Sequence, residues 1–324
     1  MIDRIIPIFI FFDSLYSIIL PLRKFIPTLI AQQTYTTPDR LTFMLRLREY
    51  AVLTKLRLSF LVVVSAITGY LMADTFAGVD FSLLIFGGFL VTGSSNGFNQ
   101  VIEREYDKLM TRTQNRPLVK GSISITEALI VSSLFGLVGL VLLYLINPLS
   151  AILGFLALFS YVAIYTPMKR ISPWAVFVGA FPGAIPPMLG FVAATGHFGL
   201  LPGLLFFVQF MWQFPHFWAI AWVLDDDYRK AGYRLLPSKF GRNHSSSFQI
   251  LLYTCAMIIA SASPYVMELT GTLSLIVCMV AGLFFYRYAL NLHHSQENSD
   301  ARKVMFASFV YLPIVQFIYV FDKL

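Results

Sequence analysis

Side chains that could do chemistry are concentrated in one stretch between two apolar segments, Asn99 to Gly121. Within this stretch Asn99, Glu103 and Asp107 recur every four residues. Four residues of an α-helix turn through about 400°, so side chains at this spacing share one face. Carboxylate and amide oxygens on one face suit Mg²⁺, which is often held jointly by carboxylates and the phosphates of a substrate. The spacing therefore predicts a magnesium site at Asn99, Glu103 and Asp107.

Basic residues continue the pattern, since Arg112, Arg116 and Lys120 follow at the same spacing. Cations of this kind bind phosphate oxygens. Acids and bases thus lie side by side, as a metal diphosphate requires. A simpler interpretation is a solvated helix with local ion pairs three residues apart, namely Arg104–Asp107 and Glu105–Lys108. The position at the end of a long apolar run favours a functional site.

A second concentration of polar residues lies near the end of another apolar run. Gln209, Trp212, Gln213, His216 and Trp218 lie inside this run. The residues that follow are acidic and then basic: Asp225, Asp226, Asp227, Tyr228, Arg229 and Lys230. Polar side chains inside apolar segments are costly and usually face the interior or a pathway. His216 therefore either lines a site or is an interior histidine with local partners.

The composition is that of a membrane protein. Hydrophobic residues make up 57% of the 324 residues and charged residues 13%, against about 25% charged in soluble domains. The mean hydropathy is +0.71. Apolar runs of membrane-spanning length predict an all-α polytopic bundle. We place nine spans, at 58–73, 81–98, 125–146, 149–165, 174–194, 201–223, 248–267, 271–290 and 304–321.

The net charge of +7 is distributed unevenly between the connections of these spans. The connections after spans two, four, six and eight are rich in Lys and Arg, whereas the other four contain neither. Basic loops remain on the cytoplasmic side of a membrane. The charge therefore orients the chain with the even-numbered connections in the cytoplasm, and it does not indicate binding to nucleic acid.

The span at 174–194 contains three prolines, Pro182, Pro186 and Pro187, among small residues. A proline inside a helix leaves a backbone carbonyl without its helical donor, so a neighbour or a cavity must satisfy that carbonyl. The small residues also permit close helix packing.

Several motifs together resemble one family. The sequence Asn99-x3-Glu103-x3-Asp107 is similar to the Asn-x3-Asp-x3-Asp motif of the intramembrane (UbiA-type) prenyltransferases. The following residues resemble the protohaem IX farnesyltransferase (haem O synthase) branch: Met110-Thr-Arg112-Thr, Asn115-Arg116-Pro-Leu-Val-Lys120-Gly, Tyr165-x3-Lys169, Gly183-Ala-Ile-Pro186-Pro187, His216-Phe-Trp218-Ala and Asp226-Asp227-Tyr228-x2-Ala-Gly. The resemblance extends from about residue 50 to the end.

Two positions depart from the family pattern. Glu103 stands where Asp is usual, and its longer side chain would shift a bound ion. The acidic cluster Asp225–Asp227 is contiguous and lacks the Asp-x3-Asp spacing of other branches. Which of its carboxylates binds metal is therefore open, although Asp226 and Asp227 are the expected ligands.

The resemblance implies a bundle of nine transmembrane helices around a central cavity that opens to the cytoplasm and to lipid. It implies transfer of a farnesyl group from farnesyl diphosphate to a vinyl group of haem B, which gives haem O. Mg²⁺ would bind at Asn99, Glu103, Asp107, Asp226 and Asp227, with Lys169 also catalytic. The expected substrate-binding residues are Arg112, Arg116, Lys120, Tyr165, Arg170, His216, Trp218 and Tyr228.

Two other functions are compatible with parts of the sequence. One is a prenyltransferase for an aromatic quinone precursor, with the same metal chemistry. The other is a transporter, although the spans show no evident inverted repeat or paired broken helices. The expected location is the bacterial inner membrane, with the mouth of the site in the cytoplasm. The expected partners are the lipid bilayer and an enzyme that modifies haem O.

The first part of the chain lies outside this resemblance. Asp13 and Pro21 interrupt its short apolar runs. We expect residues 1–43 to be an extension that is disordered or that precedes the true translation start at Met44. Residues 44–324 would then form the nine-helix membrane domain.

Overall fold

The computed structural model describes residues 38–238 and 240–324, where every named element is a helix. The chain divides into two units, Met1–Arg48 and Glu49–Leu324. The predicted boundary at residues 43 and 44 falls inside the first described helix, and residues 1–37 of the predicted extension lie outside the described residues. The helices from α3 onward belong to the second unit.

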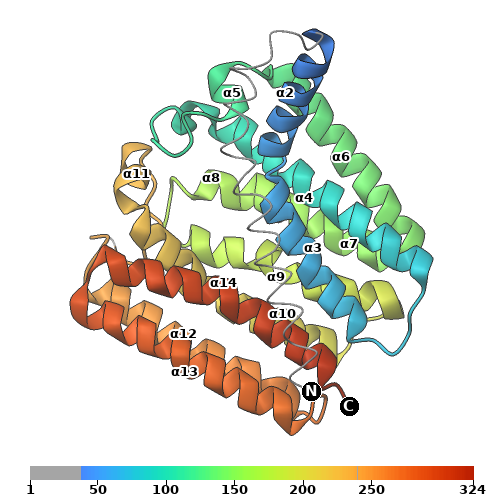
Figure 1. Ribbon diagram of the computed structural model, residues 1–324, viewed down its shortest axis with the longest axis vertical. Coiled ribbons are helices and arrows are strands. Elements are labelled where there is room, and N and C mark those ends of the chain that lie inside the picture. The colour runs from blue at the N-terminus through green and yellow to red at the C-terminus, as the bar shows by residue number, and fades with distance from the viewer. Residues whose placement is uncertain (1–37, 239) are drawn as a thin grey trace. The chain divides into compact units, whose positions relative to one another are not determined.

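Figure 1 shows the order of the helices, in which the longest connections between described helices are 108–116 and 231–243. Their bounds are α2 (Pro38–Leu53), α3 (Leu56–Leu71), α4 (Gly78–Asp107), α5 (Pro117–Lys120), α6 (Ile125–Ile146), α7 (Pro148–Phe159), the π-helix η2 (Ser160–Tyr165), α8 (Thr166–Met168), α9 (Ala175–Thr195), α10 (Leu200–Val223), α11 (Asp225–Lys230), α12 (His244–Val266), α13 (Thr272–Ser295) and α14 (Asn298–Phe321).

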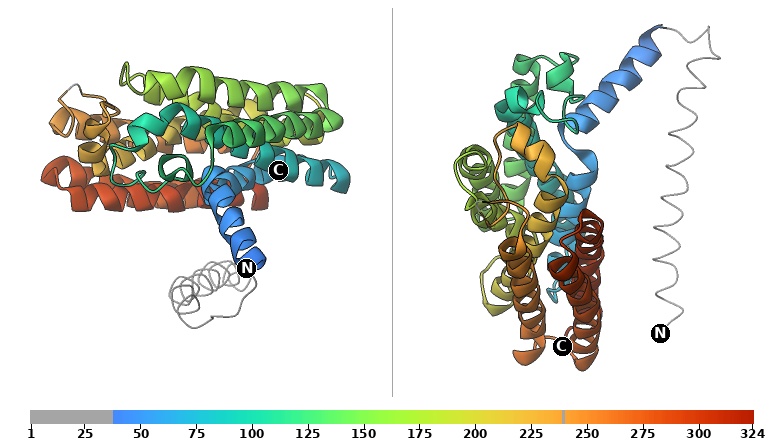
Figure 2. Two further views of the ribbon diagram at one scale, coloured as in Figure 1. Left: turned by 90° about the horizontal axis from the view of Figure 1, so that it is seen from above. Right: turned by 90° about the vertical axis from the view of Figure 1, so that its left-hand side faces the viewer.

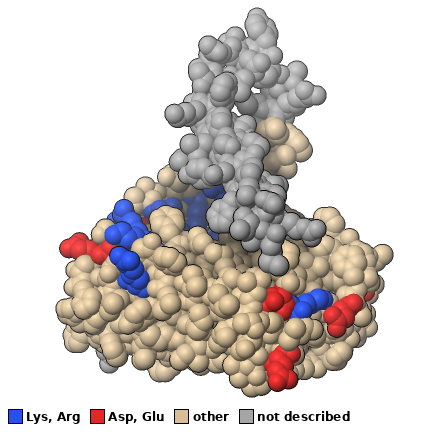
Figure 3. Space-filling model, turned by 60° about the horizontal axis from the view of Figure 1, so that its bottom comes forward, with Lys and Arg blue, Asp and Glu red and all other residues tan. Residues whose placement is uncertain are grey.

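Length and composition identify the membrane spans. In the described part of the chain eight helices are long and apolar enough to cross a membrane. The number is nine if the bent pair Phe43–Leu53 and Leu56–Leu71 is counted as one span. On the face shown in Figure 3, uncharged residues predominate and the charged side chains gather in separate groups. The predicted all-α polytopic bundle is confirmed.

Two helices form the centre of the bundle. In the most apolar windows of α9 and α10, 61% of residues are buried, whereas the figure for α6 is 22%. Helix α9 packs against α3, α7 and α10, while α10 also packs against α12 and α14. The views in Figure 2 show α12, α13 and α14, in orange and red, grouped together. The residues of α9 and α10 are therefore the ones most able to line an interior site.

Side-chain caps fix where several helices begin. The Ser124 hydroxyl accepts from the backbone amide of Glu127 at 3.1 Å, which satisfies an amide that has no helical acceptor at the start of α6. Asn147 accepts in the same way from Ser150 at 2.8 Å before α7, and Asn243 accepts from Ser246 at 2.9 Å before α12. Such caps place the ends of the apolar helices at defined residues.

The prolines of α9 leave a carbonyl that the neighbouring helix satisfies. Pro187 has no N–H, so the carbonyl of Gly183 has no donor four residues later. That carbonyl accepts instead from the side-chain amides of Gln209, at 2.6 Å, and Gln213, at 3.0 Å. This bears out the expectation that a neighbour satisfies the carbonyl, and it anchors two polar residues of α10 against α9.

A π-helical turn changes the path of the span that begins at α7. Residues Ser160–Tyr165 form the π-helix, and α8 then ends before Lys169. A π turn adds a residue to a helical turn and often occurs at functional sites. The last residue of the π-helix, Tyr165, packs closely against α9, because a Cβ on Gly179 would lie only 2.6 Å from the Tyr165 ring. The glycine in α9 therefore makes room for the ring of Tyr165.

Candidate functional site

The acidic end of α4 carries the three residues that the spacing predicts to share a face. Asn99, Glu103 and Asp107 are 1%, 5% and 1% exposed. Their common burial confirms that they lie on one inward face, although two of them carry charge. A buried carboxylate needs a partner, because removing its hydration costs several kcal/mol.

Each member of this face has a cationic partner from another part of the chain. Lys169 forms an ion pair with Glu103. Arg116 pairs with Oδ2 of Asp107 at 2.5 Å, and the ammonium of Lys55 donates to Oδ1 of Asn99 at 3.2 Å. These cations come from three segments, so folding gathers a compact acid–base cluster. We call Lys55, Asn99, Glu103, Asp107, Arg116 and Lys169 the acid–base cluster.

One oxygen in the cluster has no such partner. Oδ1 of Asp107 is buried and accepts no hydrogen bond from any described residue. An unpaired buried carboxylate oxygen is costly and needs an explanation such as an ion. Because Asp107 shares its face with the Glu103 carboxylate and the Asn99 amide, the donor set suits a hard divalent cation.

Lys55 is a member of the cluster that our sequence analysis did not single out. It lies at the break between α2 and α3, with φ 48° and ψ 56°. This left-handed conformation is unusual for a residue with a side chain, and such strain often marks functional sites. The only signal in the sequence is a lysine just before an apolar span.

The other predicted phosphate-binding residues are less enclosed. Arg112 and Lys120 are exposed, and in the described structure neither side chain has an ion-pair partner. The guanidinium of Arg170 stacks on the ring of Tyr106, 4.0 Å from its centroid. Of the predicted basic residues, the structure therefore brings Arg116 and Lys169 into the cluster and leaves the others at its rim.

The carboxylates of the second acidic group have separate partners. Asp225 pairs with Arg229 at 2.9 Å. The side chain of Asp226 is 80% exposed and pairs with Arg242 at 3.0 Å. In the described ranges no three His, Cys, Asp or Glu side chains converge closely enough to hold a metal ion.

Asp227 joins α11 to the connection after α4. Its carboxylate accepts from the backbone amides of Thr111, at 2.8 Å, and Arg112, at 3.1 Å, and from Lys230 at 3.1 Å. Burial acts to raise the pKa of Asp227, but the bonds from these three donors outweigh it and lower the pKa to about 2. The carboxylate is therefore ionised across the physiological pH range and holds the two connections together.

Aromatic rings surround the cluster. The ammonium of Lys169 lies 4.8 Å from the centroid of the Tyr165 ring and 5.9 Å from that of Tyr233. The ring of Tyr228 contacts Tyr233, with centroids 6.0 Å apart. Tyr233, which our sequence analysis missed, is 2% exposed and lies beside the ion pair of Glu103 and Lys169.

A cavity of about 270 Å³ adjoins the cluster, although none of the six cluster residues lines it. Asn96, one turn before Asn99, lines it, as does Tyr165 beneath Lys169. The polar lining comprises Ser65, Thr92, Ser95, Asn96, Tyr161, Tyr165, Gln209, Gln213 and His216. The rest is apolar and includes Trp212, Phe217 and Phe309.

The two residues of α10 that the resemblance predicts to bind substrate, His216 and Trp218, lie in different surroundings. His216 lines the cavity. Trp218 is buried outside it, where its ring packs 5.0 Å from that of Tyr253 on α12. Trp212, four residues before His216, lies in the cavity wall and stacks on the imidazole with ring centroids 4.2 Å apart.

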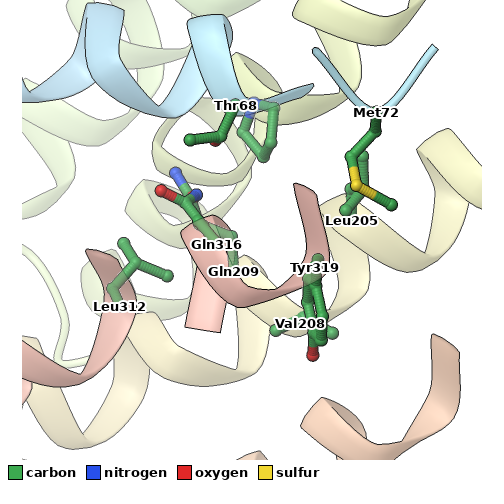
Figure 4. Close-up of a pocket in the computed structure, with 9 residues that line it drawn as sticks. Thr68, Met72, Leu205, Val208, Gln209, Leu312, Gln316 and Tyr319 are labelled. Atoms are coloured by element: carbon green, nitrogen blue, oxygen red, sulfur yellow. The ribbon is translucent and has the colours of Figure 1, made fainter. Parts of the chain in front are cut away.

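A second, much smaller cavity of about 10 Å³ lies next to Gln209 (Figure 4). Gln316 of α14 donates to Oε1 of Gln209 at 2.6 Å and accepts from Ser65 at 3.1 Å. These bonds join α3, α10 and α14. The small cavity has room for about one water at most, so of these two cavities only the larger one is able to hold a substrate.

The fold and the site define a polytopic membrane protein with an acid–base cluster at one end of a largely apolar cavity. The chain belongs to the UbiA prenyltransferase family, whose model matches residues 62–311. This finding confirms the resemblance stated from the motifs and makes the protein an integral membrane prenyltransferase.

Individual relatives support the assignment to this family. The chain is 48% identical over 283 residues to a protein of Christiangramia forsetii named protoheme IX farnesyltransferase, covering 86% of this chain and 94% of that protein. It is 36% identical over 290 residues to a protein of the same name from Koribacter versatilis, covering 86% and 94%. The similarity thus extends along nearly the whole of each relative.

Solved structures share the fold. A structure of digeranylgeranylglyceryl phosphate synthase matches with a TM-score of 0.71 at 21% identity, over 85% of this chain and 98% of that chain. A UbiA homologue from Archaeoglobus fulgidus, bound to GPP and Mg²⁺, matches with a TM-score of 0.58 at 17% identity, over 84% and 99%.

Proposed function

We propose that this protein transfers the farnesyl group of farnesyl diphosphate to a vinyl group of haem B, giving haem O. The observation that carries the proposal is the identity of 48% to a protein named protoheme IX farnesyltransferase over 86% of the chain. The acid–base cluster beside a largely apolar cavity supports it, because the donor has a charged head and a long apolar tail.

Asn99, Glu103 and Asp107 would hold Mg²⁺, and the unpaired Oδ1 of Asp107 supports this assignment. Bound Mg²⁺ supplies positive charge that stabilises a departing diphosphate. The second acidic group stays a weaker candidate, because Asp226 is largely exposed and Asp227 already accepts three hydrogen bonds.

The basic residues would bind the diphosphate. Lys169 and Arg116 now neutralise buried carboxylates, and Lys55 donates to Asn99. When the diphosphate is bound, these cations would contact its oxygens instead. Because these cations are already gathered in one buried site, only a change of partner is needed for them to stabilise the leaving anion. Arg112 and Lys120, which are exposed, would guide the diphosphate into the site.

The cavity would hold the farnesyl chain and the acceptor. Breaking the bond between C1 and the diphosphate oxygen leaves an allylic cation, which the faces of Tyr165, Trp212 and Phe217 would stabilise. The terminal carbon of the vinyl group then bonds to C1. The positive charge moves to the vinyl carbon next to the porphyrin ring, where a water oxygen adds and a proton is lost.

The cluster would face the cytoplasm of a bacterial cell, within the inner membrane. The connections that carry it are the basic ones, and basic loops remain on that side. Haem B and farnesyl diphosphate would enter from this side or from the bilayer, and an enzyme that modifies haem O would take the product.

The test is to incubate the purified protein with haem B, farnesyl diphosphate and Mg²⁺ and to identify products by mass. We expect haem B to gain one farnesyl group and one hydroxyl group. Omitting Mg²⁺, with a chelator present, should abolish the product. Prenylation of an aromatic quinone precursor, with haem B unchanged, would overturn the proposal.

A further inference from the structure

His216 on α10 is held by α14 through a single hydrogen bond. Nδ1 of His216 lies 2.8 Å from the hydroxyl oxygen of Ser308. The indole N–H of Trp212 donates to the backbone carbonyl of Ser308 at 2.9 Å, and the ring of Phe309 meets the imidazole edge-on. Ser308 is fully buried. The imidazole is therefore fixed on three sides by neighbouring groups.

The partners of Ser308 decide which nitrogen of His216 carries the proton. A serine hydroxyl has one proton to donate. The Ser308 hydroxyl donates it to the carbonyl of Met305 at 2.6 Å. It must then accept from His216, so the imidazole N–H is at Nδ1. A neutral ring is expected here, because an unpaired charge inside a membrane span is costly.

The other ring nitrogen is consequently a base with a free electron pair. Nε2 of His216 has no hydrogen-bond partner among the described residues, and it is not one of the fully enclosed side-chain atoms. His216 lines the larger cavity. A neutral imidazole whose second nitrogen is hydrogen-bonded is the usual form of a histidine that ligates a metal.

We propose that Ser308 is a positioning residue that holds His216 with the Nε2 electron pair facing the cavity, where Nε2 ligates the iron of the haem acceptor. This inference rests on the proposed function, since haem B must be the substrate. Iron lies at the centre of the porphyrin and the vinyl groups at its edge. A histidine ligand would therefore hold the acceptor while leaving the reacting vinyl group free.

The test uses resonance Raman spectra of the purified protein with ferrous haem B, without farnesyl diphosphate. An iron–histidine stretching band is expected in the wild type and should be absent from His216→Ala. In Ser308→Ala the band should shift, and haem affinity should fall about tenfold, as for the loss of other outer partners of a ligand. Ser308→Thr, which keeps a hydroxyl group, should restore both properties.

Ser261→Ala is the matched control, because it removes a buried serine hydroxyl that bonds to Tyr311 at 2.7 Å instead of to His216. Its spectrum should match the wild type. All variants should bind farnesyl diphosphate within a few-fold of the wild type, which shows that they fold. A band that persists in His216→Ala, or one unaffected by Ser308→Ala, would overturn this inference and leave the proposed function standing. Failure of the wild type to bind haem B would overturn the proposed function as well.

Discussion

The carboxylate of Asp227 accepts a 2.8 Å hydrogen bond from the backbone amide of Thr111, which lies 116 residues earlier in the chain. The bond joins the acidic end of α10–α11 to the connection that carries Arg112 and Arg116. Asp227 therefore has a structural role that the acidic motif alone did not reveal. Its carboxylate either holds this connection in place or binds metal, and the two interpretations predict different results.

Asp227→Asn should therefore loosen the connection around Thr111. The amide side chain keeps one acceptor oxygen but loses the charge that strengthens bonds from Thr111, Arg112 and Lys230. We expect the Thr111 and Arg112 amides to exchange hydrogen about tenfold faster, since a bond to a charged group contributes roughly 1.5 kcal/mol or more. Hydrogen-exchange mass spectrometry of the protein without substrates measures this.

The control is Asp226→Asn, because that side chain is 80% exposed. It should leave the exchange of both amides unchanged. If Asp227→Asn also leaves exchange unchanged but raises the Mg²⁺ concentration needed for activity, then Asp227 is a metal ligand and its bonds to the connection are incidental.

The dependence of turnover on Mg²⁺ should rest mainly on residues of α4. Asp107→Asn replaces a buried carboxylate whose Oδ1 has no partner in the described structure, and the amide cannot supply its charge. We expect turnover to fall by roughly 100-fold, the scale seen when one electrostatic group is removed from an active site. Glu103→Asp, which keeps the charge, should reduce turnover much less.

Glu105→Gln is the control, because Glu105 pairs with exposed Lys108 at 2.6 Å outside the acid–base cluster. Initial rates over a range of Mg²⁺ concentrations, with thermal unfolding measured in parallel, distinguish a lost ligand from a damaged fold. Equal turnover of wild type and Asp107→Asn at saturating Mg²⁺ would remove Asp107 from the metal site.

Much of the fold could be predicted because the membrane constrains it strongly. Backbone groups in lipid must bond internally, so long apolar runs become helices. The four-residue spacing likewise placed Asn99, Glu103 and Asp107 on one buried face. These features depend on local periodicity and composition, which a single sequence contains.

Features that depend on tertiary packing were less accessible. The predicted pairing of Glu105 with Lys108 is present, but Arg104 pairs with Glu105 and not with Asp107, whose partner is Arg116. The left-handed conformation of Lys55 and the partners of Asp227 follow from contacts between distant segments. No local pattern specifies such contacts.

Helix periodicity could have distinguished the two tryptophans of α10. Trp212 lies four residues before His216 and so shares its face, whereas Trp218 lies two residues after it and points elsewhere. The structure agrees, with Trp212 in the cavity wall and Trp218 packed on Tyr253. The spacing of the two tryptophans from His216 was present in the sequence, but our assignment of Trp218 to the site did not take it into account.

The extension should be dispensable. A chain that starts at Met44 lacks residues 1–43, which lie outside both the motifs and the family match at residues 62–311. We expect this chain to insert into the membrane and to retain activity within a few-fold of the full chain. Membrane fractionation and product formation measure both properties, and failure to insert would show that the extension is required.

The final prediction concerns Lys55, whose backbone conformation and ammonium group can be tested separately. A left-handed residue with a side chain costs about 1–2 kcal/mol relative to glycine, so Lys55→Gly should preserve the bend between α2 and α3. It also removes the ammonium that donates to Asn99 at 3.2 Å. We therefore expect unchanged or higher thermal stability, together with farnesyl diphosphate affinity lowered about tenfold or more.

Lys55→Met separates the two effects further, because it removes the charge but keeps the conformational cost. It should lose diphosphate affinity to the same extent as Lys55→Gly while being less stable than Lys55→Gly. Arg57→Met, which removes an exposed cation two residues later in α3, is the control and should change neither property. Haem affinity should be the same in all three variants. If both Lys55 variants bind farnesyl diphosphate as the wild type does, the ammonium serves only to hold Asn99 in place.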